Sequence, residues 1–163
     1  MNNRPAHNRW LVWLLLLIGI LLQLMPWTSS IYGIEPNWLL LILVYWHIAL
    51  PHRFGIGTAF IIGLILDLLS GSVLGIHTFA FSVVAYLSLF NFQLIRNLAL
   101  WQQLIVIILL SICYEFCLFI IEILINHSIM ISPISLVSCI VNGVLWPLNF
   151  LFMRMIRKRF WIS

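Results

Sequence analysis

The sequence has very little charge. Eight Lys and Arg and four Asp and Glu make 7% of its 163 residues, whereas about 25% of the residues in soluble domains are charged. Hydrophobic residues make up 64% of the chain. A soluble fold cannot hide this much apolar surface, but helices in lipid are apolar on every side. We therefore expect one all-α, polytopic membrane domain over residues 1–163.

Cysteine and catalytic motifs are also scarce. Cys113, Cys117 and Cys139 lie inside apolar runs, with no CxxC pair and no His at ligand spacing. The chain has no HExxH, GxSxG, phosphate-loop or dinucleotide-binding pattern. The basic residues are few and flank apolar runs, unlike the basic patch of a nucleic-acid-binding protein. These absences predict a protein that is not an enzyme, binds no cofactor or metal, and does not bind nucleic acid.

Apolar runs predict six membrane-spanning helices, at about residues 10–25, 37–50, 54–69, 74–90, 98–126 and 133–153. The first run follows basic residues but has no Ala-x-Ala-like cleavage site, so it is interpreted as a retained span. The second is short for a span of about 20 residues, so local thinning of the bilayer or burial must compensate. The third and fourth runs, joined at Ser70 to Ser72, form a predicted antiparallel hairpin.

The basic residues predict the orientation of these helices. Two of the eight precede the first run, one lies between the second and third runs, and one lies between the fourth and fifth. The other four follow the sixth run. The other turns, at 28–36, 70–74 and 126–132, contain none. Because cytoplasmic loops carry the excess of Lys and Arg, both termini are predicted in the cytoplasm. Arg53 and Arg96 then face the cytoplasm and Glu35 faces outside.

The third helix carries a strip of mainly small residues at four-residue spacing: Gly55, Ala59, Gly63, Asp67 and Gly71. Small residues so placed allow another helix to approach closely. The strip is interpreted either as packing within the chain or as an interface with a partner protein.

Asp67 is the unusual member of this strip. A carboxylate at mid-bilayer has an insertion cost of roughly 2.5 to 3.5 kcal/mol, and the last turn of a helix disfavours negative charge. Three explanations stay open: the side chain snorkels outward, pairs with His77 across the hairpin, or contacts a partner or ligand in a polar cavity.

The fifth predicted helix has a polar stripe of Ser111, Glu115, Glu122 and Asn126 at spacings of four, seven and four. Glu115 is the deepest, so we expect it to turn into the bundle, protonated or hydrogen-bonded. Structural packing, partner binding and a proton relay are the alternatives.

The sixth predicted helix contains Asn142, Gly143 and Pro147. Proline lacks an N–H and its ring clashes with the carbonyl four residues earlier, which predicts a kink. Asn142 or a neighbouring helix could satisfy the freed backbone group. The kink is interpreted as structural, or else as a hinge or a notch for docking a helix.

Several ordered segments resemble the MreD family, the integral membrane subunit of the bacterial rod-shape machinery. They are Met25-Pro26-Trp27, Pro36-Asn37-Trp38, Leu50-Pro51-His52-Arg53, the stretch from Gly63 through Asp67 and Ser70-Gly71-Ser72 to Gly75, Arg96-Asn97, Trp101-Gln102-Gln103, and Asn142 through Trp146-Pro147 to the basic tail. The resemblance extends from about residue 9 to 159. The first eight residues and the segment 126–132 carry no family pattern.

The resemblance implies a multi-pass scaffold of the bacterial inner membrane that is needed for rod shape and sidewall peptidoglycan synthesis. Its implied partners are MreC first, then MreB, RodZ, RodA and the elongation transpeptidase, besides membrane lipid. The strip containing Ala59 and Gly63 is the first candidate for the MreC contact. The family is also similar in fold to the S components of vitamin transporters. The alternative function is therefore a solute-binding transporter subunit, with a pocket near Asp67 and His77.

Overall fold

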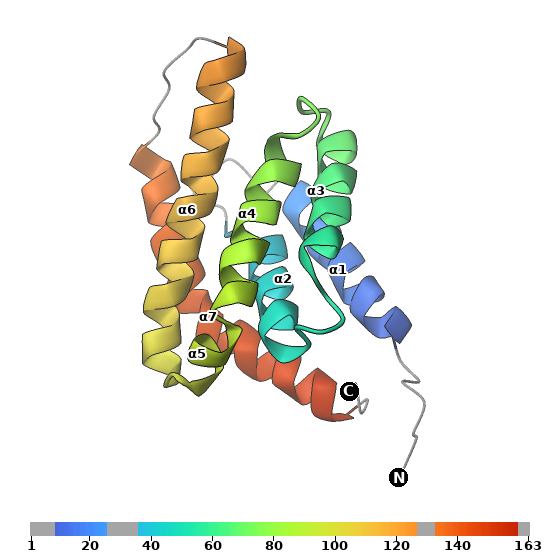
Figure 1. The fold of residues 1–163 in the computed structure, drawn as a ribbon, viewed down its shortest axis with the longest axis vertical. Helices are drawn as coiled ribbons and strands as arrows, with labels where there is room; N and C mark the ends of the chain where they lie inside the picture. Colours follow the sequence, from blue (N-terminus) through green and yellow to red (C-terminus); the bar gives the residue numbers. More distant parts are fainter. Residues whose placement is uncertain (1–8, 26–35, 127–132, 160–163) are drawn as a thin grey trace.

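The computed structural model describes residues 9–25, 36–126 and 133–159. These residues form helices and no strands, which confirms the all-α expectation (Figure 1). The helices are α1 (Arg9–Leu24), α2 (Trp38–Ala49), α3 (Ile56–Ser70), α4 (Ile76–Phe90), α5 (Phe92–Asn97), α6 (Leu100–Asn126) and α7 (Pro133–Arg159). Most of the predicted outer turns at 28–36 and 126–132, Glu35 included, lies outside the described residues.

Two described helices, at Leu100–Ile125 and Leu136–Arg159, are each long and apolar enough to cross a membrane. Four more, α1 to α4, are apolar but shorter. The fold is therefore that of a helical membrane protein, while six spans remain a prediction.

Two boundaries differ from the sequence prediction. The short helix α5 was not predicted. It is separated from α4 by Asn91, whose side-chain amide donates to the carbonyl of Leu87 over 3.3 Å. Helix α7 continues beyond residue 153 to Arg159. Arg and Lys are good helix formers, and positive charge is favourable in a last helical turn.

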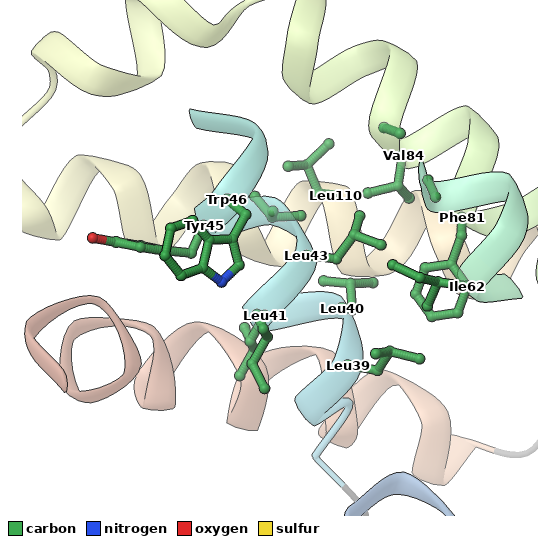
Figure 2. Close-up of a cluster of buried hydrophobic side chains, with 14 of the residues drawn as sticks. Leu39, Leu40, Leu41, Leu43, Tyr45, Trp46, Ile62, Phe81, Val84 and Leu110 are labelled. Carbon is green, nitrogen blue, oxygen red and sulfur yellow. The ribbon is translucent and has the colours of Figure 1, made fainter. Parts of the chain in front are cut away.

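The short helix α2 lies at the centre of the bundle. Every residue from Leu39 to Ile48 is buried, and α1, α4, α5 and α7 all pack against it. Figure 2 shows Leu39, Leu40, Leu41 and Leu43 pointing from α2 toward different neighbours. Twelve residues span about 18 Å, which is less than the ~30 Å hydrocarbon core. Burial inside the protein compensates for this length.

Asn142 joins three helices at the beginning of α2. Its Oδ1 accepts the backbone N–H of Asn37 over 2.8 Å, and its Nδ2 donates to the Ser111 hydroxyl over 3.3 Å. Asn37 in turn caps α2, because its Oδ1 accepts the N–H of Leu40 over 3.1 Å. The bonds that Asn142 makes among the described residues link α7 to α2 and α6. Satisfaction of the backbone group freed by Pro147, by Asn142 or by a neighbouring helix, stays a prediction.

Helix α7 passes through Pro147 without ending and changes direction along its length (Figure 1). Four residues before the proline, Gly143 lies so close to α6 that an added Cβ would collide with the side chain of Ile108. On the same stretch, Nε1 of Trp146 donates to Oε1 of Gln103 over 3.1 Å. The Gly143 region therefore docks α7 onto α6 of the same chain.

We predict that Asn142→Ala lowers the free energy of unfolding by about 1–3 kcal/mol, because it leaves a buried N–H without an acceptor. The measurement is thermal or denaturant unfolding of the purified protein in detergent. Asn97→Ala is the matched control, since Asn97 is exposed on α5 and should change stability little. Equal effects of the two substitutions would contradict the stabilising role of the bond between Asn142 and the Asn37 N–H.

Candidate functional site

The turn between α3 and α4 folds the start of α4 back onto the last turn of α3. Gly71 ends α3 with φ +66° and Gly75 precedes α4 with φ +106°. Glycine adopts these left-handed conformations at no steric cost, whereas other residues are strained there. Two glycines four residues apart thus close the predicted hairpin.

Asp67 is completely buried in this hairpin, with both carboxylate oxygens hydrogen-bonded. Oδ1 accepts the Ser72 hydroxyl over 3.1 Å and the His77 N–H over 3.0 Å, and Nδ1 of His77 lies 2.8 Å away. Oδ2 accepts the N–H of Gly75 over 3.0 Å and of Thr78 over 3.2 Å, and the Thr78 hydroxyl over 2.7 Å. The carboxylate is therefore bound entirely by the chain's own groups.

Three of these donors are backbone N–H groups at the beginning of α4. Such groups have no partner within their own helix, and a negative charge at a helix N-terminus is favourable. Asp67 therefore caps α4 from α3, which offsets the unfavourable position at the end of its own helix. Of the three explanations for Asp67, the structure shows the contact with His77. Its complete burial is not compatible with snorkelling.

The small-residue strip packs inside the chain. Ala59 is fully buried, and a Cβ added to Gly63 would lie 2.5 Å from Cα of Thr78 and 2.9 Å from its nitrogen. Gly55 and Gly71 have no such neighbour within 4 Å. The interpretation of the strip as an open partner surface is therefore corrected for Ala59, Gly63 and Asp67, which are enclosed by the protein itself.

The predicted polar stripe on α6 does not form one network. Ser111 is buried against Asn142, whereas Glu115 is half-buried and Glu122 is exposed. Within the described residues neither glutamate has a hydrogen bond, and the side chain of Asn126 lies outside them. Among the described residues, the hydrogen bonds form no chain of polar groups that could relay protons along α6.

Several buried amides were missed by the sequence analysis. Nε2 of Gln103 donates to the carbonyls of Ile95 and Leu98, both over 3.1 Å, and so holds the end of α5. Nδ2 of Asn149 donates to the carbonyl of Leu41 over 3.2 Å. The signal was present, since Asn149 follows Asn142 by seven residues on an apolar helix and so shares its face.

The described residues contain no group of three His, Cys, Asp or Glu side chains that could hold a metal ion. All three cysteines are free, with Cys117 and Cys139 buried and Cys113 half-buried. The polar side chains of the described residues bond to backbone groups at helix ends, and the small residues allow close packing between helices.

We predict that Gly63→Ala destabilises the protein, because its methyl group must push the backbone of α4 away at Thr78. Gly57→Ala on the same helix is the matched control, as nothing lies within 4 Å of its added Cβ. Higher helix propensity should make that control neutral or stabilising, by up to about 1 kcal/mol. Unfolding of both variants in detergent measures the difference, and a Gly63→Ala protein as stable as the control would disprove this close contact.

We predict that Asp67→Asn lowers the free energy of unfolding by at least about 2 kcal/mol, since an amide NH2 cannot accept the bonds made to one carboxylate oxygen. Glu122→Gln removes an exposed carboxylate in the same way and should have little effect. The yield and thermal unfolding of both proteins are the readouts. If the two variants behave alike, Asp67 does not stabilise the hairpin.

Comparison with known proteins shows which family this chain resembles. The family model of the rod shape-determining protein MreD matches residues 5–156. The rod shape-determining protein MreD of Haemophilus influenzae is 34% identical over 142 residues, which are 87% of this chain and 87% of that protein. No solved structure matches the chain with statistical significance. The range of the family model includes α2, the α3–α4 hairpin and the amides of α7. From the two matches it follows that this chain belongs to the MreD family.

Proposed function

We propose that this protein is a non-enzymatic scaffold of the inner membrane that maintains rod shape by binding MreC and supporting sidewall peptidoglycan synthesis. The observation that carries the proposal is the family match over residues 5–156. Membership of a rod shape-determining family supports the role in cell shape. MreB, RodZ, RodA and the elongation transpeptidase are the further members of the proposed assembly.

The polar side chains of the interior support a scaffold rather than a catalyst or a solute carrier. Asp67, Asn142 and Gln103 each bond to another element of the same chain. The carboxylate that would anchor a solute pocket near His77 is fully buried, with both oxygens occupied by the hairpin. No described contact favours solute capture.

The distribution of charge supports a multi-pass orientation with both termini in the cytoplasm. Arg53 lies between α2 and α3, Arg96 lies in α5, and the last turn of α7 is basic. These elements lie at one end of the bundle, and the α3–α4 turn lies at the other (Figure 1). Under the positive-inside rule the end with the basic residues faces the cytoplasm.

In this proposal, MreC contacts the outer surface of the helices. Large apolar side chains such as Trp13, Leu17, Phe60, Phe116 and Leu148 are exposed, so the membrane-embedded surface is suited to lipid and to apolar helices. Association in lipid relies on packing and on hydrogen bonds between helices rather than on the hydrophobic effect. The enclosed part of the α3 strip, Ala59, Gly63 and Asp67, packs behind this surface.

We expect depletion of the protein in its native host to turn rods into rounded cells, and expression of the wild-type chain to restore them. Microscopy is the readout, with expression of an unrelated polytopic membrane protein as the control. Depleted cells that keep their rod shape would refute the role in shape.

We also expect a tagged copy to retain MreC when membranes are solubilised in mild detergent. The Glu122→Gln variant should retain MreC as the wild type does, and an unrelated membrane protein should retain none. Rounding on depletion together with absent MreC would keep the shape role and refute the direct contact.

A further inference from the structure

The last turns of α7, residues 148–159 and called the terminal segment below, carry an exposed apolar stripe. Its members are Leu151, Phe152 and Met155. Because residues three and four apart share a face of a helix, Met155 is a surface neighbour of both Leu151 and Phe152. Phe152 is 55% exposed and Met155 is 62% exposed, so the described part of the chain leaves the stripe uncovered.

A second face of the terminal segment fixes its rotation. Nδ2 of Asn149 donates to the carbonyl of Leu41 over 3.2 Å. The ring of Phe150 packs edge-on against that of Tyr45, with centroids 5.6 Å apart, and Met153 is buried. With these side chains held in the bundle, the apolar stripe faces outward.

Four cations lie within the last six residues of α7. They are Arg154, Arg157, Lys158 and Arg159. All except Arg157 are exposed. Arg154 follows Leu151 by three residues, and Lys158 and Arg159 follow Met155 by three and four, which makes these cations surface neighbours of the stripe. The terminal segment is therefore apolar on one exposed face and basic along its edges.

Among the described residues, no carboxylate pairs with these cations. The ion pair that those residues form joins His77 to Asp67, in the α3–α4 hairpin at the other end of the bundle (Figure 1). Glu115 lies about 22 Å along α6 from its beginning at Leu100, and Glu122 lies farther still. A counter-charge for the terminal segment must therefore come from outside the described chain.

The direction of α7 keeps the terminal segment near the membrane surface. A straight helix of 27 residues is about 40 Å long, or about 10 Å longer than a ~30 Å hydrocarbon core. Instead, α7 changes direction, and its last part runs obliquely across the lower end of the bundle (Figure 1). The stripe thus stays close to the boundary between lipid and water rather than projecting into water.

We propose that the terminal segment lies in the membrane surface and binds anionic phospholipids, with the stripe among the acyl chains and Arg154, Lys158 and Arg159 at the headgroup phosphates. Helices with an apolar face and basic edges bind in this way, and a guanidinium binds a phosphate through two parallel hydrogen bonds. Free phosphate or an acidic soluble protein matches the cations but leaves the stripe in water, whereas a lipid matches both.

The choice of the inner leaflet rests on the proposed orientation, in which the basic end faces the cytoplasm. Binding to anionic lipid itself needs neither that orientation nor contact with MreC. Loss of MreC retention would therefore refute the proposed assembly and leave this inference standing.

Native mass spectrometry of the full-length protein in detergent tests the charge requirement. Phosphatidylglycerol should bind more tightly than phosphatidylcholine with the same acyl chains. Substituting both Arg154→Gln and Lys158→Gln should weaken only phosphatidylglycerol binding, by roughly fivefold for each cation removed. The matched control combines Arg53→Gln with Arg96→Gln, two exposed cations outside α7. Equal binding of the two lipids to the wild type, or equal effects of the two double variants, would overturn the proposal.

Fluorescence quenching in nanodiscs that contain phosphatidylglycerol tests the orientation of the terminal segment. An environment-sensitive fluorescent amino acid is introduced singly into the full-length chain. At Phe152 and Met155, doxyl-labelled lipid should quench it more strongly than acrylamide does, and at Arg154 and Lys158 acrylamide should be the stronger quencher. Acrylamide quenching that rises steadily from Phe152 to Lys158 would show a helix projecting into water and would overturn the proposal.

Two further arms identify the occupant. Millimolar inorganic phosphate should not displace phosphatidylglycerol, and displacement would assign the cations to free phosphate instead. A photo-crosslinking amino acid at Met155 in native membranes should yield a lipid adduct. A discrete protein adduct at this position would show that a partner protein covers the stripe, contrary to the proposal.

Discussion

The backbone of α2 must be satisfied without help from water, and much of the remaining structure follows from this constraint. At about 18 Å the helix is too short to reach both surfaces of the bilayer. Each helix end leaves four backbone groups without internal partners, and such groups are costly in a dry environment. At the beginning of α2, the side chains of Asn37 and Asn142 accept backbone N–H groups. At its end, the N–H of Leu50 donates to the carbonyl of Trp46 over 2.8 Å.

The α3–α4 hairpin solves the same problem with a carboxylate instead of an amide. Asp67 bonds to the first N–H groups of α4, and Gly63 lets the two helices approach closely enough for this contact. The negative charge of Asp67 is unfavourable at the end of α3 but favourable at the beginning of α4, so it stabilises the hairpin. Both sites show buried polar side chains acting across helices, as is usual for ionisable and amide groups inside membranes.

The apolar runs were enough to predict the membrane class and the approximate limits of every described helix except α5, because hydropathy reports directly on the surrounding solvent. The runs did not predict α5, because a six-residue helix separated from α4 by the single residue Asn91 has no apolar run of its own. Asp67 was recognised as unusual, and His77 was one of its suggested partners. Its capping of α4 was not foreseen, because it depends on the left-handed conformations of Gly71 and Gly75. The hydrogen-bond partners of Asn142 and Asn149 likewise could not be predicted, because they depend on how α7 packs against α2.

The link between Asn37 and Asn142 also has a consequence for biosynthesis. Asn142, whose side chain accepts the Asn37 N–H, is synthesised 105 residues after Asn37. Asn149, which donates to the carbonyl of Leu41, follows Leu41 by 108 residues. Helix α2 is therefore synthesised well before the helix that completes its surroundings. Until α7 has been synthesised, the N–H of Asn37 and the carbonyl of Leu41 lack these partners, so the bundle closes only when its last helix arrives.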